Sequence, residues 1–525
     1  MRRTVVVVFA VLVALGLLAP PSYAQAPAPK VTINGLVDFV MDAFSNTSQH
    51  DRDVTNRADK GWSTRERGVF TLTGEVGRVK GVWAIELDFM NGAGATNAGN
   101  AFNGGLNSTV HTGITANLDL DTDVAGAVET KWLYLETPIT GPGSLMPFIP
   151  VTTIGRFGGQ PARGHNYKNG ELFSGDFAGA ALETTWAPNL RSTLTYAQIG
   201  EAIERTLAKG QKEQFAILAS LEVDVFKGLS IKPTYAYAFY NGANCGTNNL
   251  GTPPFGGVNF VGTSCTAPPV GNNGVGDIKR HYFGLDARLT VGPFYVEPSA
   301  YYMYGEEDIP TTVGRKNVDI RAYILDTTAG FRAGPLLIEA RAMYTPGVGA
   351  NHILGNGGGG TDRTYRAINA AFGYMSGWTE IWTGNVDYQN SLLIGQSGLV
   401  LRESPSYDKY GRRWLALALD YSLTPALTLK ALTNVSWTDT KVDTTGVLNA
   451  GTFGINSNGV RGTERYLGNE WDLGFQYRFA PNVTFDAVAA MLLTGDALNH
   501  RRVVGGPVKE SQDVYKGAAR IRVTF

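Results

Sequence analysis

The segment from Tyr515 to Phe525 alternates between two kinds of side chain. Its odd positions carry apolar or small residues, whereas its even positions carry polar or small residues, among them Lys516, Arg520 and Arg522. Successive side chains of a β-strand point to opposite faces of the sheet. The segment therefore predicts a strand with one dry face and one face that needs water. A soluble β-sandwich and a barrel in a membrane both contain such strands, so other parts of the chain must distinguish them.

The N-terminal segment has the pattern of a cleaved export signal. Two arginines precede an apolar run over 5–19, and small residues shortly before position 25 mark a cleavage site. We therefore predict a signal peptide over 1–24, a short extended leader over 25–30 and a single β-barrel domain over 31–525. The alternative, a helical membrane anchor, needs about 20 apolar residues. This run is shorter and is followed at once by two prolines.

The composition fits a chain that crosses a membrane as strands. Beyond the signal, no apolar stretch is long enough for a helix to span a bilayer. The 525 residues include 65 Gly, 23 Tyr, 24 Phe and 9 Trp, and the mean hydropathy is only -0.09. Membrane barrels have such averages because half of each strand faces the lumen. The formal net charge of -1, with no concentrated basic face, gives no indication of a nucleic-acid partner.

One unit recurs along the chain: a strand, a tight turn, a second strand and a long polar loop. Short turns at one end and long loops at the other are typical of outer-membrane barrels. The turns contain Gly, Pro or Asn and lie at 77–79, 187–189, 226–228, 291–293, 333–335, 424–425 and 480–482. The loops are rich in Gly, Asn, Ser and Thr and lie near 91–127, 158–175, 241–277, 346–362, 389–410, 439–463 and 496–511.

These patterns predict an all-β fold, a transmembrane antiparallel up-and-down β-barrel. The number of strands should be even, about 18 and at most about 20. Alternation is broken over 138–157, 305–332 and 363–390, where we expect a bulge or a different strand boundary. A barrel of this width leaves an aqueous lumen unless it is plugged.

Three segments resemble the bacterial outer-membrane porins. The segment 31–38, VTINGLVD, is similar to a first strand common in that family. The segment 153–160, TIGRFGGQ, is similar to its G-R-Q element, here interrupted by F-G-G, and Phe525 matches its terminal aromatic. The chain is longer than a porin of about 16 strands, and in length it is similar to substrate-selective and polysaccharide-export channels of about 18 strands. The resemblance implies outer-membrane lipids as surroundings, insertion by the barrel assembly machinery through the C-terminal strand, and either a monomer or a homotrimer.

The resemblance also implies that the loop after Arg156 folds into the lumen and narrows it. That loop places cations, an imidazole and a carboxylate in a Gly-rich frame. Opposite charges across a narrow pore set its ion preference. The constriction candidates are Arg156, Arg163, His165, Lys168 and Glu171; the alternative is an ordinary solvated surface loop.

Charges of both signs lie on the inward faces of the predicted strands. Many of them should pair with a neighbouring strand and stiffen the wall. Cations on the last strands are the best candidates for a row of basic side chains along the pore, which would favour anionic solutes weakly. The pore-lining candidates are Arg412, Arg478, Lys516, Arg520 and Arg522.

The two cysteines, Cys245 and Cys265, fall in one long loop and predict a disulfide in an exported chain. No His/Cys spacing nearby indicates a metal site. The 6 histidines are scattered, and neither a G-x-S-x-G elbow nor an H-E-x-x-H motif occurs. We therefore expect no enzyme, no metal and no cofactor.

Together these features predict an outer-membrane porin, a passive diffusion channel for small hydrophilic solutes or ions. Two alternatives remain open from the sequence. One is a substrate-selective channel or an exporter of an anionic polysaccharide. The other is a structural or adhesive barrel that acts through its outer loops.

Overall fold

A computed structural model of the chain describes residues 28–46, 60–92, 123–124, 128–168, 171–173, 176–200, 214–240, 278–311, 314–350, 360–368, 377–386, 405–407, 410–445, 462–501 and 506–525. The predicted signal peptide and the predicted Cys245–Cys265 disulfide lie outside the described residues. Among the described residues, no helix is both long and apolar enough to cross a membrane.

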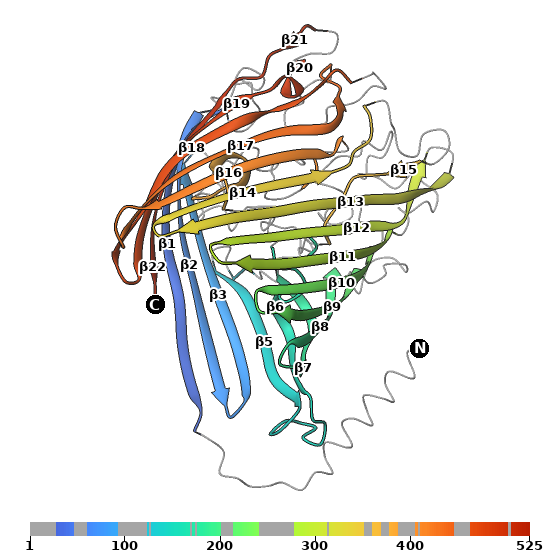
Figure 1. The fold of residues 1–525 in the computed structure, drawn as a ribbon, viewed down its shortest axis with the longest axis vertical. Helices are drawn as coiled ribbons and strands as arrows, with labels where there is room; N and C mark the ends of the chain where they lie inside the picture. Colours follow the sequence, from blue (N-terminus) through green and yellow to red (C-terminus); the bar gives the residue numbers. More distant parts are fainter. Residues whose placement is uncertain are drawn as a thin grey trace.

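The described residues form a closed antiparallel barrel of 18 strands (Figure 1). Each strand pairs with its neighbour in the chain, and β22 closes the sheet by pairing with β1. The barrel strands are β1 (Lys30–Ser45), β2 (Lys60–Val76), β3 (Val79–Gly92), β5 (Val128–Thr140), β6 (Thr152–Pro161), β7 (Asp176–Ala187), β8 (Leu190–Gly200), β9 (Gln214–Phe226), β10 (Leu229–Tyr240), β11 (Ile278–Val291), β12 (Phe294–Thr311), β13 (Gly314–Ala333), β14 (Leu336–Thr345), β16 (Arg412–Ser422), β17 (Leu427–Val442), β18 (Glu464–Ala480), β19 (Val483–Thr494) and β22 (Val514–Thr524).

Among the described residues, six short elements accompany the barrel. They are β4 (Asp123–Val124), β15 (Thr361–Asp362), β20 (His500–Arg501), β21 (Val508–Lys509), helix α3 (Glu380–Thr383) and the 3-10 helix η4 (Asp496–Leu498). β15 pairs in parallel with β13, and β20 pairs with β21 in a separate two-stranded sheet.

Alternating side chains explain why these segments form a barrel wall. Along β16, Arg412 and Trp414 are buried, whereas Leu415 and Leu417 are exposed. The exposed set is the apolar one, which is the reverse of a soluble protein and the arrangement required against lipid. The other strands repeat this arrangement, with large apolar side chains exposed on their outer faces. The predicted fold class and the even strand number are confirmed, and the exposed apolar belt is that of a transmembrane β-barrel.

The two ends of the barrel differ as predicted. All seven predicted tight turns join consecutive barrel strands at one end, which is periplasmic by the rule that short turns face the periplasm. Within 305–332, β12 and β13 pair in unbroken register and the strand boundary lies at 312–313, so the alternative of a different boundary is the one observed. Within 138–157, the register of β5 with β6 shifts between Pro138 and Thr140, as a bulge produces. Residues 346–411 connect β14 to β16, and the described part of this stretch includes the two-residue strand β15.

The two ends of the barrel sheet are joined through Phe525. The N–H of Phe525 donates to the oxygen of Gly35 at 3.0 Å, and the N–H of Gly35 donates to the oxygen of Phe525 at 2.9 Å. The Phe525 ring lies 5.8 Å from that of Phe70. A β-carbon at Gly35 would stand 2.6 Å from the oxygen of Val69 and 2.8 Å from the Phe525 ring, so glycine is required there.

The largest apolar cluster lies inside the barrel, not on its surface. It joins inward side chains of β11, β12 and β13 to residues of two long connections, including Leu172, Phe173, Tyr365, Ile368 and Trp382. The inward face of β13 is itself apolar at its outer end, with Ile320, Ala322 and Ile324 buried. These connections are therefore folded into the lumen, where they pack as a core.

A candidate constriction inside the barrel

The connection between β6 and β7, residues 162–175, lies against the inner wall; we call it the inner loop. Its backbone is held by inward side chains of two strands: Ser220 donates to the oxygen of Gly164 at 3.1 Å, and Thr234 donates to the oxygen of His165 at 2.9 Å. His165 Nε2 shares a hydrogen bond of 2.7 Å with Thr195 Oγ1. Burial, with Lys232 as a second cause, lowers the pKa of His165 to about 3, so the imidazole is neutral at ordinary pH.

Lys168 fixes the far side of the inner loop to β12 and β13. Its ammonium donates to the main-chain carbonyl oxygens of Glu297 and Asp326 at 2.9 and 3.0 Å, and it lies 3.3 Å from a carboxylate oxygen of Asp326. Arg341 binds the same carboxylate, with Nη2 to Oδ2 at 2.6 Å. The buried carboxylate of Glu171 lies 3.3 Å from Lys168 and 3.9 Å from Arg341. Two cations and two carboxylates therefore form one buried cluster.

The carboxyl group of Glu171 resists ionisation within this cluster. Burial and the nearby Asp326 raise the pKa of Glu171 well above its usual range, because a second buried negative charge is disfavoured there. Lys168 is held by oxygens of Glu297 and Asp326 and therefore serves mainly to attach the loop. Arg163 differs from Lys168, because its side chain is exposed and the described residues include no ion pair for it.

Tyr167 connects the inner loop to the periplasmic half of the wall. Its ring lies between two cations, with Lys232 Nζ 4.3 Å and the Arg288 guanidinium 4.4 Å from the centroid. Its hydroxyl donates to Glu222 at 3.2 Å. Burial and Glu222 raise the pKa of Tyr167, so the hydroxyl remains protonated. Cation–π contacts of this kind strengthen as water is excluded.

Arg156 stands at the base of the inner loop, on β6. Its guanidinium donates to Glu136 at 2.7 Å and to Glu183 at 2.5 Å, on the two strands that flank β6. An arginine between two carboxylates stiffens this part of the wall. The structure therefore places Arg156 as an anchor of the strand that leads into the loop.

The connection 346–411, which we call the second inner connection, covers the inner loop. Ile368 N–H donates to the oxygen of Leu172 at 2.8 Å, and the Tyr365 hydroxyl donates to the oxygen of Glu171 at 2.7 Å. On the wall side, the Tyr282 hydroxyl donates to the oxygen of Arg366 at 3.0 Å. Burial raises the pKa of Tyr365, so this hydroxyl also stays a donor.

The same connection also contacts β18 and β22, through α3. The N–H groups of Glu380 and Ile381 donate to Asp472 and Glu470 of β18 at 2.7 and 2.5 Å. The carboxylate of Glu380 lies 2.9 Å from Lys516 of β22. The described parts of this connection therefore contact the inner wall at β13 and again at β18 and β22, four to six barrel strands further round. Figure 1 shows its coiled segment within the barrel outline.

The predicted pore-lining cations have different surroundings. Lys516 is buried beside Glu380, Arg520 lies 2.9 Å from Asp486, and Arg522 pairs with Asp38. Arg412 is buried under the rings of Trp382 and Tyr407, at 5.4 and 5.8 Å. The fifth candidate, Arg478, is exposed near the periplasmic end. The three β22 cations share one inward face, but each has a carboxylate partner, so they do not form a ladder of uncompensated charge.

Sequence reasoning missed the second inner connection and the residues that hold it, such as Tyr365, Ile381, Glu470 and Asp472. Its local signal was weak: Trp378 and Trp382 stand in a segment without strand alternation, and two large aromatics seldom stay in a solvated loop. Their burial partners come from distant strands, which local pattern cannot identify.

Comparison with known proteins gives a likeness of overall structure only. No family model matches the chain, and no curated protein matches it. Among solved structures, Pseudomonas aeruginosa OpdQ is 11% identical and covers 95% of this chain and 97% of its own, with a TM-score of 0.47. Pseudomonas aeruginosa OpdL is 11% identical, with 94% and 99% covered and a TM-score of 0.47. Pseudomonas aeruginosa OccK5 (OpdH) is 10% identical, with 94% and 98% covered and a TM-score of 0.45. At these identities no residue role is transferred.

Proposed function

We propose that this chain is an outer-membrane channel through which small hydrophilic solutes diffuse passively, and that the inner loop and the second inner connection select among them. One observation carries the proposal: two connections are folded into the lumen of a closed transmembrane barrel and attached to separate parts of its inner wall. A narrowing built from docked loops leaves a wide barrel with a small, fixed passage.

The chemistry of the wall supports a hydrophilic cargo. Charged side chains face the lumen on strands around the barrel, such as Asp38, Glu136, Glu222, Asp486 and Arg522. Most of the charges described are paired, so the passage offers dipoles and balanced charges in place of a strong field of one sign. This balance does not favour an exporter of an anionic polysaccharide, which would need uncompensated cations along its path.

Planar-bilayer recording of the purified protein tests the proposal. We expect discrete single-channel currents, and liposome swelling should proceed with small polar solutes and slow as solute size increases. Arg163→Ala should shift the reversal potential under a salt gradient toward cation preference, because it removes an exposed lumen charge. Lys441→Ala, at an exposed position near the outer end of β17, is the matched control. A barrel that inserts but conducts no current would refute the channel.

A further inference from the structure

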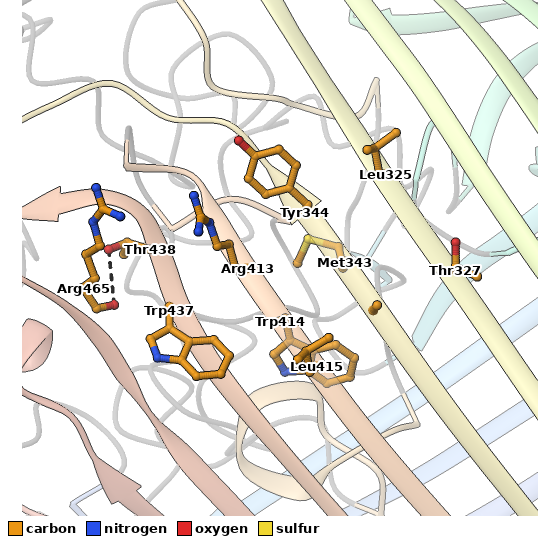
Figure 2. Close-up of a pocket in the computed structure, with 11 residues that line it drawn as sticks. Leu325, Thr327, Met343, Tyr344, Arg413, Trp414, Leu415, Trp437, Thr438 and Arg465 are labelled. Atoms are coloured by element: carbon orange, nitrogen blue, oxygen red, sulfur yellow. Dashed lines mark hydrogen bonds between the residues drawn. The ribbon is translucent and has the colours of Figure 1, made fainter.

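A groove of about 570 Å³ lies on the outer surface of the barrel, across β13, β14, β16 and β17. Its lining includes Leu325, Tyr344, Arg413, Leu415 and Trp437 (Figure 2). Four of these lie in one cross-strand row, in which Leu325 pairs with Tyr344, Tyr344 with Arg413, and Arg413 with Trp437. Their neighbours Met343 and Trp414 are buried on the inward face, so the row faces away from the lumen.

The groove exists because β14 carries a small residue between larger neighbours. Ala342 pairs with Thr327 on one side and with Leu415 on the other, one step closer to the periplasm than the row of Tyr344. Leu415 is 51% exposed and Leu325 is 47% exposed, so the walls of the groove are apolar and open. An apolar furrow at this depth lies against the hydrocarbon of the bilayer.

The extracellular end of the groove is cationic. Arg413, with 52% of its side chain exposed, and Arg465 both line it, and Tyr344 and Trp437 stand beside them. β14 ends at Thr345, so this row lies at the extracellular margin of the wall. Aromatic side chains of membrane barrels occupy that level, where lipid headgroups begin. The two arginines are therefore at headgroup depth, above an apolar furrow at acyl-chain depth.

Asp439 holds one of the arginines in place without cancelling the positive charge. Pairing of β17 with β18 passes from Trp437–Tyr466 directly to Val442–Glu464, so the residues between them in β17 form a β-bulge. Asp439 in this bulge accepts from Arg413 at 2.8 Å and from Tyr344 at 3.1 Å. Two arginines against one carboxylate leave one net positive charge. Among the described residues, no ion pair is found for Arg465.

We propose that this groove binds a phosphorylated lipid of the outer leaflet, with one acyl chain in the furrow over Ala342 and a phosphate on Arg413 and Arg465. Guanidinium groups match phosphate oxygens in charge and in geometry, and they accept this role when fixed by packing. The location on the lipid-facing wall and the charge at headgroup depth select a lipid over a soluble anion. The inference depends on the transmembrane placement and not on conduction through the lumen.

Lipid retention in nanodiscs tests the proposal. Wild-type protein and variants are placed in phosphatidylcholine nanodiscs containing lipid A, and native mass spectrometry counts the lipid A molecules that remain after release into detergent. Arg413→Ala with Arg465→Ala should reduce retention about tenfold, because charge-assisted hydrogen bonds are lost. Ala342→Trp, which fills the furrow, should reduce it similarly.

Matched controls separate the groove from the rest of the surface. Arg321→Ala removes an exposed outward arginine of β13 that does not line the groove. Ala489→Trp enlarges an exposed alanine of β19 at the same distance from the start of its strand. Both controls should retain lipid A as the wild type does. Heat-modifiable migration confirms that each variant is folded.

Four results would overturn the proposal. One is equal retention by the arginine double variant and the wild type, and another is equal retention of dephosphorylated lipid A. The third is a cysteine crosslink between two copies through position 415 in nanodiscs, which would show that a second copy covers the groove. Displacement of lipid A by inorganic phosphate alone would likewise show that a soluble anion, not a lipid, is the ligand.

Discussion

Replacing Lys168 by Met should release the inner loop from the wall. The change keeps the length of the side chain and removes the ammonium that contacts Glu297, Asp326 and Glu171 at 2.9 to 3.3 Å. The side chains of Asp326 and Glu171 are buried, and Arg341 would remain as the cation near them. Breaking a buried ion pair by removing one partner costs about 3–5 kcal/mol. The docked state of the loop should therefore lose about two to four orders of magnitude in relative population.

Two measurements can detect the release of the inner loop. Single-channel recordings should show more current noise and rapid changes in conductance, because the loop leaves and returns to its site. Proteinase K should cut the inner loop faster in intact proteoliposomes. Arg163→Ala is the control, since it lies in the same loop with an exposed side chain and should leave both properties unchanged apart from ion preference. If Lys168→Met matches the wild type in noise and in proteolysis, the cluster does not hold the loop.

Three further changes test other parts of the structure. Burial and Lys232 lower the pKa of His165 from 6.5 to about 3 in the docked loop, so the released loop binds a proton more readily than the docked one. Current noise should therefore rise as the pH falls from 6.5 towards about 3, and it should rise less in His165→Gln. Lys516→Met removes the partner of Glu380 and should free α3, which a rise in single-channel conductance would reveal. Deletion of Phe525 removes the two hydrogen bonds between Phe525 and Gly35 at the end of the β1–β22 seam and should lower the heat-modifiable, inserted fraction severalfold on gels. Normal insertion would contradict the role given to Phe525.

The wall of this barrel could be predicted from the sequence because its rules are local. The alternation of Arg412 to Tyr421 is the same whichever strands lie beside it, so one segment is enough to assign an inward and an outward face. Turn residues such as Gly292 and Gly334, both with positive φ, mark reversals directly. The connection 312–313 is absent from the predicted turns, because the alternation over 305–332 gave no clear strand boundary.

The interior of the barrel could not be predicted in the same way. Residues that hold the inner loop are far apart in the chain: Tyr365 and Glu171 are separated by 194 positions, and Lys168 and Asp326 by 158. The five constriction candidates were assigned by resemblance and charge, yet only Arg163 presents an exposed cation, while His165, Lys168 and Glu171 are buried in contacts. A charged residue in a loop looks the same in sequence whether it is solvated or docked.

The pairing of β1 with β22 also sets the order in which the molecule can be built. Arg522 and Asp38 meet across 484 positions of chain. Bringing the ends of such a segment together costs about 5 kcal/mol of chain entropy by the logarithmic law, against about 2 kcal/mol for a turn of ten residues. Hairpins can thus form as soon as their own strands are available, whereas the last seam must wait for the whole wall. Until then both edges are open to strands of other molecules. The ion pair at this seam and the Gly35–Phe525 bonds therefore form last in assembly. A chain truncated within the wall would remain an open sheet whose two edges can pair with strands of other molecules.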